Sequence, residues 1–399
     1  MTVTIHPSKP TGQVKAPPSK SMAHRLLICA GLASGKSRIE GISYSEDILA
    51  TIDCLKALGA EIETGDTYAE VTGTDPKGPA CAVLPCRESG STLRFIIPVC
   101  MLSPAETRLV GSDSLMNRPL IVYERLFAER GLQFKKSGNS LSIKGKLPPG
   151  TYSFAGNVSS QFASGLLFAL PLLGEDSRIE LMPPVESRPY IDMTVSALNG
   201  FGVKADWVNE AEIAIPGCQC YMPRELTVEG DWSNSAFLIA MGIPVTGLDD
   251  KSLQGDRICT EYYAALDDGC PALDISDCPD LGPVLFAYAA MHSGGRFTGT
   301  DRLRLKESDR CESMKAELEK FGTEVIVGEN EITVGSGISR PKVPLDSHND
   351  HRIAMAMSVL CAAVGGTIRG AESVSKSFPD YFEVIRSAGI EVVKDEMDI

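Results

Sequence analysis

Apolar runs of helical length recur six times along the chain, each with a small polar or acidic start and a glycine or short break after it. They are Ser19 to Ala33, Glu88 to Leu102, Ser159 to Leu173, Asp231 to Ile243, Asp277 to Met291, and Asp346 to Ala363. Because these runs are apolar almost all round, they predict buried helices. Their recurrence about every 70 residues, with a shorter fifth unit, predicts an internal repeat.

A short strand-like stretch follows each apolar run. These stretches are Arg38 to Ile42, Thr107 to Gly111, Ser177 to Met182, Pro244 to Leu248, Arg296 to Thr300, and Thr367 to Ala371. A second helix with charges on one face comes next and ends at a glycine such as Gly131 or Gly389, because glycine readily adopts the left-handed conformation of a helix C-cap. The pattern predicts mixed α/β repeats, with three buried and three outer helices in each domain.

The length of 399 residues exceeds the size at which one hydrophobic core usually stops growing, which favours two domains. A boundary is expected between Gly217 and Glu229, after three repeats. The segment Ser8 to Pro18, rich in proline, lysine and glycine, is a candidate second crossing. We therefore expect a first domain at 19–228, with repeats one to three, and a second domain that combines 1–18 with 229–399.

The composition narrows the classes of function. The net charge of −14 argues against nucleic acid or an anionic membrane as a partner, since both need a dense basic surface. The first residues lack the features of a secretion signal, which predicts a cytoplasmic location. The twelve cysteines are scattered, and neither CxxC nor HExxH occurs, so we expect reduced thiols and no metal site.

Cations stand at the starts of the predicted helices. Lys20, Ser21 and Arg25 open the first buried helix, and Gly90 and Arg94 open the second. A helix N-terminus presents unpaired N–H groups and a positive dipole end, so a cation placed there creates an anion site. The arrangement recurs at Asn117-Arg118-Pro119, Lys306 to Arg310, Asn349 to Arg352, and Ser375 to Pro379. One such cation is usually solvated or paired at the surface, but six recurrences predict a pocket for a ligand with several negative charges.

Seven short motifs occur in a specific order. They are Lys20-Ser21-x-x-x-Arg25, Gly90-Ser91-Thr92-Leu93-Arg94, Asn117-Arg118-Pro119, Ser159-Ser160-Gln161, Lys306-Glu307-Ser308-Asp309-Arg310, Asn349-Asp350-His351-Arg352, and Lys376-Ser377-Phe378-Pro379. In this order they closely resemble the 5-enolpyruvylshikimate-3-phosphate synthases of the enolpyruvyl transferase family. The resemblance extends from Lys20 to Phe382.

The resemblance implies an α/β fold of two similar domains, each of three βαβαββ units in an inverse α/β barrel, with the active site in the interdomain cleft. It implies transfer of the carboxyvinyl group of phosphoenolpyruvate to the 5-hydroxyl of shikimate 3-phosphate, by addition and then elimination of phosphate. Both substrates are small molecules. We expect no cofactor and a monomeric enzyme.

The resemblance also assigns the binding residues. For phosphoenolpyruvate they are Lys20, Gly90, Arg94, Arg118, Gln161, Arg310, Arg352 and Lys376. For shikimate 3-phosphate they are Lys20, Ser21, Arg25, Ser159, Ser160, Gln161, Ser187, Tyr190, Asp280 and Lys306. Arginine can hold phosphate or carboxylate through two parallel hydrogen bonds, and hydroxyl and amide groups suit the hydroxyls and phosphate of the second substrate.

The catalytic residues implied are Asp280, near the attacking hydroxyl, Glu307, near C3 of the enol, and Lys20 as a further proton-transfer group. The residues themselves leave alternatives open. Asp280 can instead cap the fifth buried helix, and Glu307 can pair with Arg310 three residues on. For His351, capping or packing is at least an equal alternative to catalysis.

Two departures from familiar members of the family concern fine substrate contacts and inhibitor sensitivity. Glu88-Ser89 stands where Asn-Ala is common, and Arg302 stands where some members have asparagine. Two rival functions stay open. A sister enzyme transfers the same group to UDP-N-acetylglucosamine, but it typically has Lys-Asn where this chain has Lys20-Ser21. A non-catalytic anion-binding protein on the same scaffold is the rival from another class, and turnover distinguishes it.

Overall fold

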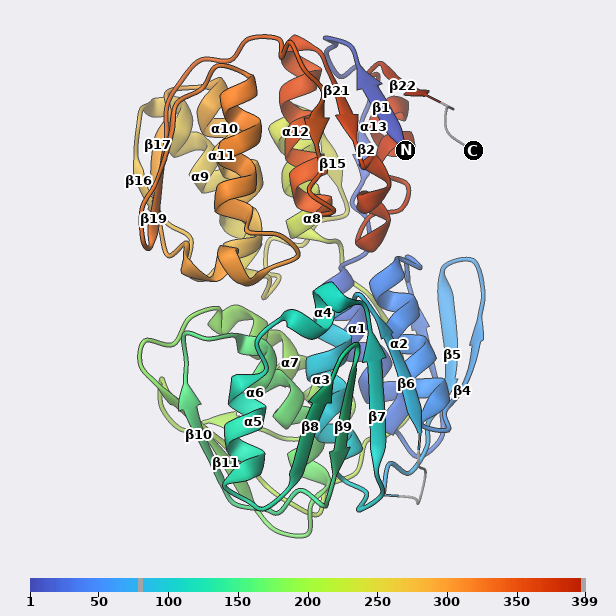
Figure 1. The fold of residues 1–399 in the computed structure, drawn as a ribbon. Helices are drawn as coiled ribbons and strands as arrows, with labels where there is room; N and C mark the ends of the chain where they lie inside the picture. Colours follow the sequence, from blue (N-terminus) through green and yellow to red (C-terminus); the bar gives the residue numbers. More distant parts are fainter. Residues whose placement is uncertain (78–81, 396–399) are drawn as a thin grey trace. The chain divides into compact units, whose positions relative to one another are not determined.

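We analysed a computed structural model, which describes residues 1–77 and 82–395 (Figure 1). Its contacts divide the chain into two compact units. The 20–228 unit consists of Lys20–Val228, and the 229–399 unit combines Glu229–Ile399 with Met1–Ser19. Within the described residues, no helix is long and apolar enough to cross a membrane.

The 20–228 unit repeats one arrangement of helices and strands three times. Its elements are α1 (Lys20–Leu32), β3 (Lys36–Glu40), α2 (Glu46–Ala57), β4 (Glu61–Thr64), β5 (Tyr68–Thr72), β6 (Val83–Arg87), α3 (Gly90–Cys100), β7 (Thr107–Gly111), α4 (Asp113–Asn117), α5 (Ile121–Ala128), β8 (Gln133–Ser137), β9 (Ser140–Lys144), β10 (Thr151–Ala155), α6 (Ser160–Ala169), β11 (Ser177–Met182), α7 (Arg188–Gly200), β12 (Asp206–Trp207), β13 (Glu212–Ile215) and β14 (Glu225–Thr227).

Its three sheets share one topology, with strand orders β14-β3-β5-β4, β6-β7-β9-β8 and β10-β11-β13-β12. In each sheet the first pair is parallel and the other pairs are antiparallel. A parallel pair needs a long crossover, which a helix supplies, whereas an antiparallel pair closes with a short turn. Each repeat is therefore βαβαββ, and β14, from the end of the unit, provides the first strand of the first repeat.

The 229–399 unit follows the same plan. Its elements are β1 (Thr2–Ile5), β2 (Val14–Lys15), α8 (Trp232–Ala240), β15 (Val245–Thr246), α9 (Cys259–Asp268), β16 (Ala272–Asp274), α10 (Gly282–Met291), β17 (Gly295–Thr298), α11 (Arg310–Lys320), β18 (Val325–Val327), β19 (Glu331–Val334), β20 (Leu345–Asp346), α12 (His351–Val364), β21 (Gly366–Arg369), α13 (Tyr381–Ser387) and β22 (Val392–Asp395).

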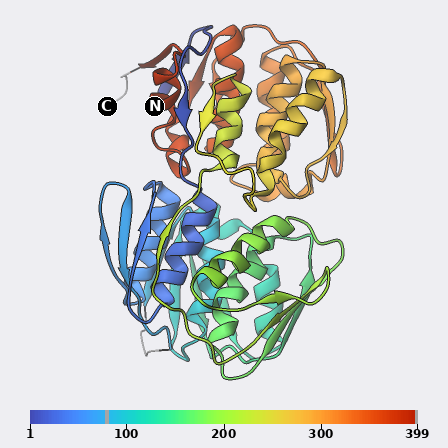
Figure 2. The ribbon, with the colours of Figure 1, turned by 180° about the vertical axis from the view of Figure 1, so that it is seen from behind.

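Two four-stranded sheets in this unit, β16-β17-β19-β18 and β20-β21-β1-β22, have the same sequence of parallel and antiparallel pairs. The N-terminal strand β1 lies between β21 and β22, so the blue start of the chain lies beside its red end in both ribbon views (Figure 1, Figure 2). The first strand of the fourth repeat is β2, which pairs with β15 alone. Both units thus borrow strands from distant parts of the chain.

The short repeat is the fourth, because α9 leads directly to β16 without the hairpin that follows the outer helix in the complete repeats. The expectation of a shorter fifth unit was therefore wrong. The spacing of the apolar runs already indicates the short unit, because the run that starts at Asp277 follows the run that starts at Asp231 more closely than any other two successive runs.

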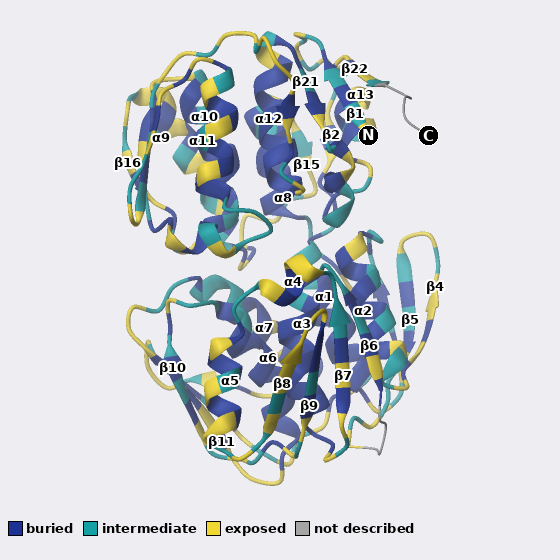
Figure 3. Cartoon of the chain, viewed as in Figure 1, coloured by how far each residue is buried: buried dark blue, intermediate teal, exposed yellow. Residues whose placement is uncertain are grey.

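The buried helices are those that the apolar runs predicted. Helices α1, α3 and α6 lie in the core of one unit, and α8, α10 and α12 lie in the core of the other (Figure 3). In α12 every residue from His351 to Ala362 is buried. The outer helices α2, α5 and α7, and α9, α11 and α13, each have at least one exposed residue. Strands β7 and β11 have the predicted bounds.

Two buried helices begin later than predicted. A 3-10 turn at Pro279–Leu281 precedes α10, which begins at Gly282 and not at Asp277. Asp346 belongs to β20, and α12 begins only at His351. An acidic residue before an apolar run is compatible with both a helix cap and a strand end, so the sequence alone did not separate the two.

Two cations that were expected at helix starts lie at helix ends instead. Arg118 follows the last residue of α4, and α5 begins three residues later at Ile121. Lys376 ends a 3-10 turn at Ala371–Lys376, before α13. Both lie in short connections between helices, where the chain turns, and the prediction that each begins a helix was wrong.

Helices α3 and α6 approach closely at Gly165, and this contact generates a prediction. A Cβ at Gly165 would lie 2.2 Å from Tyr123 Oη and 2.4 Å from the carbonyl oxygen of Arg94. The backbone oxygen cannot rotate away, so Gly165→Ala should lower the free energy of unfolding by about 1–3 kcal/mol, despite the better helix propensity of alanine. Urea unfolding measures the change. Gly174→Ala, where nothing lies within 4 Å, should change it by less than about 0.5 kcal/mol; equal effects would contradict the close approach.

Candidate active site

In the 229–399 unit, the guanidinium of Arg310 lies among three carboxylates. Its Nε donates to Asp350 Oδ2 at 2.8 Å, and its Nη1 donates to Asp280 Oδ1 at 2.8 Å. Its Nη2 donates to Glu307 Oε2 at 2.7 Å, so the ion-pair alternative for Glu307 is confirmed. Arg310 is 1% exposed and Asp350 is fully buried. Buried charges are tolerated when they are paired and hydrogen-bonded, so these contacts fix the start of α11.

Asp280 is the point where three cations meet. Its Oδ1 accepts from Lys306 Nζ at 3.1 Å as well as from Arg310, and its Oδ2 lies 3.3 Å from Arg352 Nη2. Burial alone raises the pKa of this carboxyl, but the charges of Arg352, Lys306 and Arg310 outweigh it and hold the pKa well below its usual value. Asp280 is therefore a carboxylate at neutral pH. Leu281 holds the cap position of α10, so the capping alternative for Asp280 is wrong.

The neighbours of this cluster extend it along the start of α12. Burial lowers the pKa of the Lys306 ammonium, although the charge of Asp280 opposes this change. Lys376 Nζ donates to the carbonyl oxygen of Asn349 at 2.7 Å. His351 is buried, with Nδ1 3.9 Å from Asp350 Oδ1, a position that favours packing over catalysis.

In the 20–228 unit, a second cluster forms at the start of α3. Arg94 Nη1 donates to Gln161 Oε1 at 2.7 Å, and Gln161 Nε2 donates to Ser91 Oγ at 2.9 Å. A Cβ at Gly90 would lie 2.6 Å from Arg118 Nη1 and 3.3 Å from Arg94 Nη1. Glycine thus leaves room for two guanidinium groups beside the helix N-terminus, where an anion is favoured.

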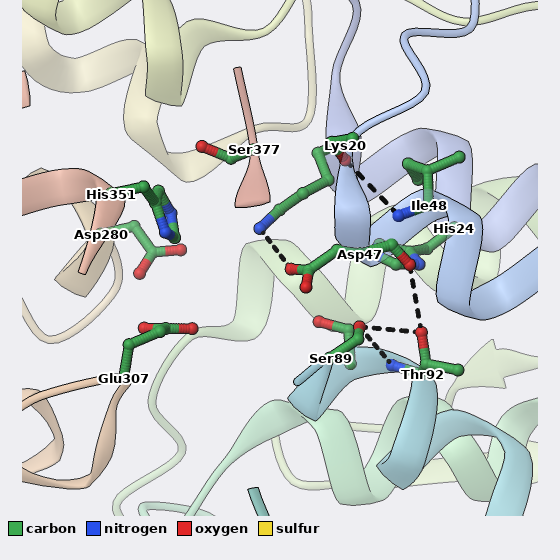
Figure 4. Close-up of polar contacts among 12 residues, drawn as sticks. Lys20, His24, Asp47, Ile48, Ser89, Thr92, Asp280, Glu307, His351 and Ser377 are labelled. Carbon is green, nitrogen blue, oxygen red and sulfur yellow. Dashed lines mark hydrogen bonds and ion pairs between the residues drawn. The ribbon is translucent and has the colours of Figure 1, made fainter. Parts of the chain in front are cut away.

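Lys20 and Arg25, both on α1, extend the second cluster. Lys20 Nζ donates to Asp47 Oδ2 at 2.8 Å, as the dashed line between them shows (Figure 4). Arg25 donates to the carbonyl oxygens of Ser21 at 2.6 Å and Tyr190 at 2.8 Å. Burial lowers the pKa of Arg25 to about 10, so it stays charged at neutral pH.

Three buried hydroxyls, of Thr51, Thr92 and Ser89, connect α1, α2 and α3. His24 Nδ1 lies 2.7 Å from Thr51 Oγ1, which lies 2.7 Å from Thr92 Oγ1. Thr92 in turn donates to Ser89 Oγ at 2.8 Å (Figure 4). Burial, reinforced by the nearby charges of Lys20 and Arg25, holds the pKa of His24 well below its usual value. This series of hydrogen-bonded groups is therefore neutral, and it holds the three helices together.

The predicted serines lie at the starts of α6 and α7. Ser159 caps α6 by accepting from the backbone N–H of Gln161 at 3.3 Å, and Ser160 is the first residue of the helix. Ser187 precedes α7 with a φ of 54°. This left-handed conformation costs a non-glycine residue about 1–2 kcal/mol. The strained position coincides with a residue that the resemblance assigns to substrate binding.

Two of the carboxylates that hold the cations, Asp350 and Asp47, were not predicted from the sequence. Asp350 lies inside one of the recognised motifs, and an acidic residue just before a buried helix was a usable signal for a cap. Asp47 lies in the first turn of α2, outside all seven motifs. Its role follows only from the contact with Lys20, 27 residues away in sequence.

Two further observations concern metal ligands and cysteine thiols. Among the described residues, no group of three or more histidine, cysteine or carboxylate side chains is arranged to hold a metal ion. The eleven described cysteines are free thiols, of which eight are buried, and Cys81 lies outside the described residues. The two clusters present carboxylate, ammonium, guanidinium, amide and hydroxyl groups.

Repeated βαβαββ units with cations gathered at the starts of their helices define a class of protein suited to small ligands with several negative charges. Residues 5–263 and 268–385 match the model of one family, described as EPSP synthase (3-phosphoshikimate 1-carboxyvinyltransferase). The chain belongs to this family.

Individual relatives agree with this assignment. The chain is 41% identical over 417 residues to the 3-phosphoshikimate 1-carboxyvinyltransferase of Clostridium kluyveri, with 98% of each chain covered. It is 37% identical to the enzyme of that name from Clostridioides difficile, with 97% of each covered. The solved structure of EPSP synthase from Acinetobacter baumannii is similar with a TM-score of 0.79 at 24% identity, covering 98% of this chain and 100% of that one. This likeness confirms the predicted fold class.

The buried pairing of Arg310 generates a stability prediction. Arg310→Met removes the shared cation and leaves buried carboxylates without their main partner, so the free energy of unfolding should fall by about 3–5 kcal/mol. The matched control is Arg296→Met. Arg296 is 56% exposed and donates to Glu331 at 3.0 Å, so its loss should cost less than about 1 kcal/mol. Equal costs in thermal or urea unfolding would show that burial adds nothing to the pairing.

Proposed function

We propose that this protein transfers the enolpyruvyl group of phosphoenolpyruvate to the 5-hydroxyl of shikimate 3-phosphate, giving 5-enolpyruvylshikimate 3-phosphate and phosphate. Family membership over nearly the whole chain supports the reaction. The observation that carries the proposal is the contact of the Asp280 carboxylate with three cations, Lys306, Arg310 and Arg352. These cations keep Asp280 ionised, and cations of this kind also bind anionic substrates.

The reaction needs a base for the hydroxyl and an acid for C3 of the enol. The 5-hydroxyl attacks C2 of phosphoenolpyruvate while C3 accepts a proton, which gives a tetrahedral adduct. Loss of that proton from C3 and of phosphate from C2 then forms the new enol ether. We propose Asp280 as the base for the hydroxyl, and Glu307 and Lys20 as the groups that exchange the proton at C3.

The electrostatics of Asp280 support its role as a base once substrates are bound. Without substrate, the surrounding cations hold its pKa well below the usual value, which makes it a weak base. A bound phosphate or carboxylate offsets part of the charge of Lys306 and Arg352, and the pKa of Asp280 then rises toward the usual range. Binding of the anions thus increases the basicity of the carboxylate when the hydroxyl is present.

We propose that the predicted binding residues hold the two substrates. Arg94, Arg118, Gln161 and Gly90, with Lys20, Arg310, Arg352 and Lys376, hold phosphoenolpyruvate. Ser21, Arg25, Ser159, Ser160, Gln161, Ser187, Tyr190 and Lys306, with Lys20 and Asp280, hold shikimate 3-phosphate. The paired guanidinium groups beside Gly90 support the first assignment, since they can share one anion.

The organisation of the enzyme follows from the same proposal. We propose that the two compact units are the two domains expected from the repeats, with one boundary at 228–229 as expected and the other at 19–20, one residue later than expected. We propose further that the enzyme acts as a monomer in the cytoplasm.

Phosphate release from phosphoenolpyruvate tests the function directly. The purified protein should release phosphate with shikimate 3-phosphate and not with UDP-N-acetylglucosamine. Asp280→Asn should lower kcat at least about 100-fold, since a positioned general base typically contributes that much. Asp277→Asn, an exposed carboxylate three residues away, should leave kcat unchanged. Circular dichroism and unfolding curves verify that both variants are folded.

The other outcomes separate the rival functions. Release only with UDP-N-acetylglucosamine would identify the sister activity. No release with either acceptor, from folded protein that binds the substrates, would identify a non-catalytic anion-binding protein.

Gly90 generates a prediction about binding. In Gly90→Ala the new methyl group would lie 2.6 Å from Arg118 Nη1, the far end of a flexible side chain that can move. Stability should therefore change little, whereas the KM for phosphoenolpyruvate should rise about tenfold, the equivalent of about 1.4 kcal/mol of lost charge-assisted hydrogen bonding. Gly174→Ala is the control. A KM for phosphoenolpyruvate unchanged in Gly90→Ala would remove Arg118 from the binding site.

A further inference from the structure

The loop between β20 and α12 supplies two groups of the cluster around Arg310 in the 229–399 unit. The carbonyl oxygen of Asn349 accepts from Lys376 Nζ, and the side chain of Asp350 pairs with Arg310. His348 and Asn349 are both left-handed, with φ values of 51° and 54°. Because two consecutive left-handed residues without glycine cost about 1–2 kcal/mol each, contacts elsewhere must hold this loop in place.

Glu317 provides those contacts. Its carboxylate is 1% exposed, and its Oε1 lies 2.8 Å from His348 Nε2. Its Oε2 accepts from the backbone N–H of Asp346 at 3.0 Å. Lys320 Nζ lies 2.8 Å from both carboxylate oxygens and keeps the buried charge paired. Glu317 therefore binds the loop at its backbone and at a side chain.

Helix α11 holds both ends of the loop. Arg310 and Glu317 are seven residues apart, which is two turns, so they lie on the same face of α11. Arg310 binds Asp350 at the end of the loop, and Glu317 binds Asp346 and His348 at its beginning. The positions of the Asn349 carbonyl and of Asp350 thus depend on contacts more than one helical turn away from the cluster itself.

We propose that Glu317 and His348 are positioning residues of the phosphoenolpyruvate site, which fix the left-handed pair His348 and Asn349 and thereby set the positions of Lys376 and Asp350. The inference rests on the proposed function. The two residues do not touch the substrate; they act through the loop.

The protonation of His348 adds a pH dependence. The charged groups that face its ring are Glu317 and Lys320 on α11 and Asp346 on β20. The hydrogen bond to Glu317 raises the pKa of His348, despite burial and Lys320. The contact with the charged ring is therefore complete below the unfolded value of about 6.5 and weakens as the pH rises through the raised folded value. The neutral ring still donates to Glu317, so part of the contact persists.

The test compares His348→Leu and His348→Gln with the wild type between pH 5.5 and about 9. Leucine removes the contact with Glu317, whereas glutamine keeps a donor that does not titrate. Both variants keep a side chain that disfavours the left-handed conformation, so this cost is shared. The control is His292→Gln, because His292 pairs with Asp267 outside this loop. Ratios of variant to wild type at each pH remove the titration of phosphoenolpyruvate itself.

In His348→Leu, we expect the KM for phosphoenolpyruvate to rise about fivefold at low pH, an effect of the size typical of residues that act through others. The kcat should change less than about twofold. The ratio should fall as the pH rises. His348→Gln should restore most of the affinity at high pH, and His292→Gln should match the wild type.

Each other result has a distinct meaning. A loss of unfolding free energy in His348→Leu, with no change in KM at any pH, would overturn the positioning role. A KM ratio that does not vary with pH would overturn the part played by protonation. Wild-type protein without turnover would instead count against the proposed function, and the two failures are therefore distinguishable.

Discussion

The structure depends on a balance between buried cations and buried carboxylates at the starts of helices. The positive end of a helix dipole is unfavourable for a cation, so the lysine and arginine residues placed there need nearby carboxylates. Arg310 is held by Asp350, Asp280 and Glu307, and Lys20 is held by Asp47. In a chain with a net charge of −14 these cations are not a general feature of the surface. They are local groups of positive charge, each held by carboxylates. Under the proposed function, a substrate anion replaces part of the negative charge that these carboxylates supply.

The fold makes this balance possible by repetition. Every complete repeat places one buried helix between parallel strands, so the buried helices of a unit begin at equivalent positions in their repeats. Lys20, Gly90 and Ser160 are far apart in sequence, yet each is the first residue of the buried helix of its repeat. Strands β14 and β1 complete sheets whose other strands lie far away in the chain, which ties the ends of each unit into its core. A site assembled from many helix starts needs this rigidity, because each start contributes only one or two groups.

Positioning in this protein extends beyond the groups that face a ligand. Glu317 and His348 hold a loop whose backbone conformation is unfavourable by itself, and the loop in turn presents a carbonyl group and a carboxylate to the cations. In the 20–228 unit, the hydrogen-bonded series of His24, Thr51 and Thr92 connects α1, α2 and α3 without adding charge. Glu317, His348 and Thr51 lie outside the seven motifs, and His24 and Thr92 are motif positions to which the resemblance assigns no binding role.

The sequence by itself determined the repeated α/β plan, the identity of the buried helices and most of the cations, because apolar periodicity and residue type are local properties. It also indicated the candidate carboxylates Asp280 and Glu307. Only the tertiary structure decided where α10 and α12 begin, and that Arg118 and Lys376 end helical segments. It also decided that Asp280 is a shared counter-ion and not a cap, and that Asp47, Asp350 and Glu317 hold the cations and the loop. These features depend on contacts between residues far apart in the chain, which local patterns do not encode.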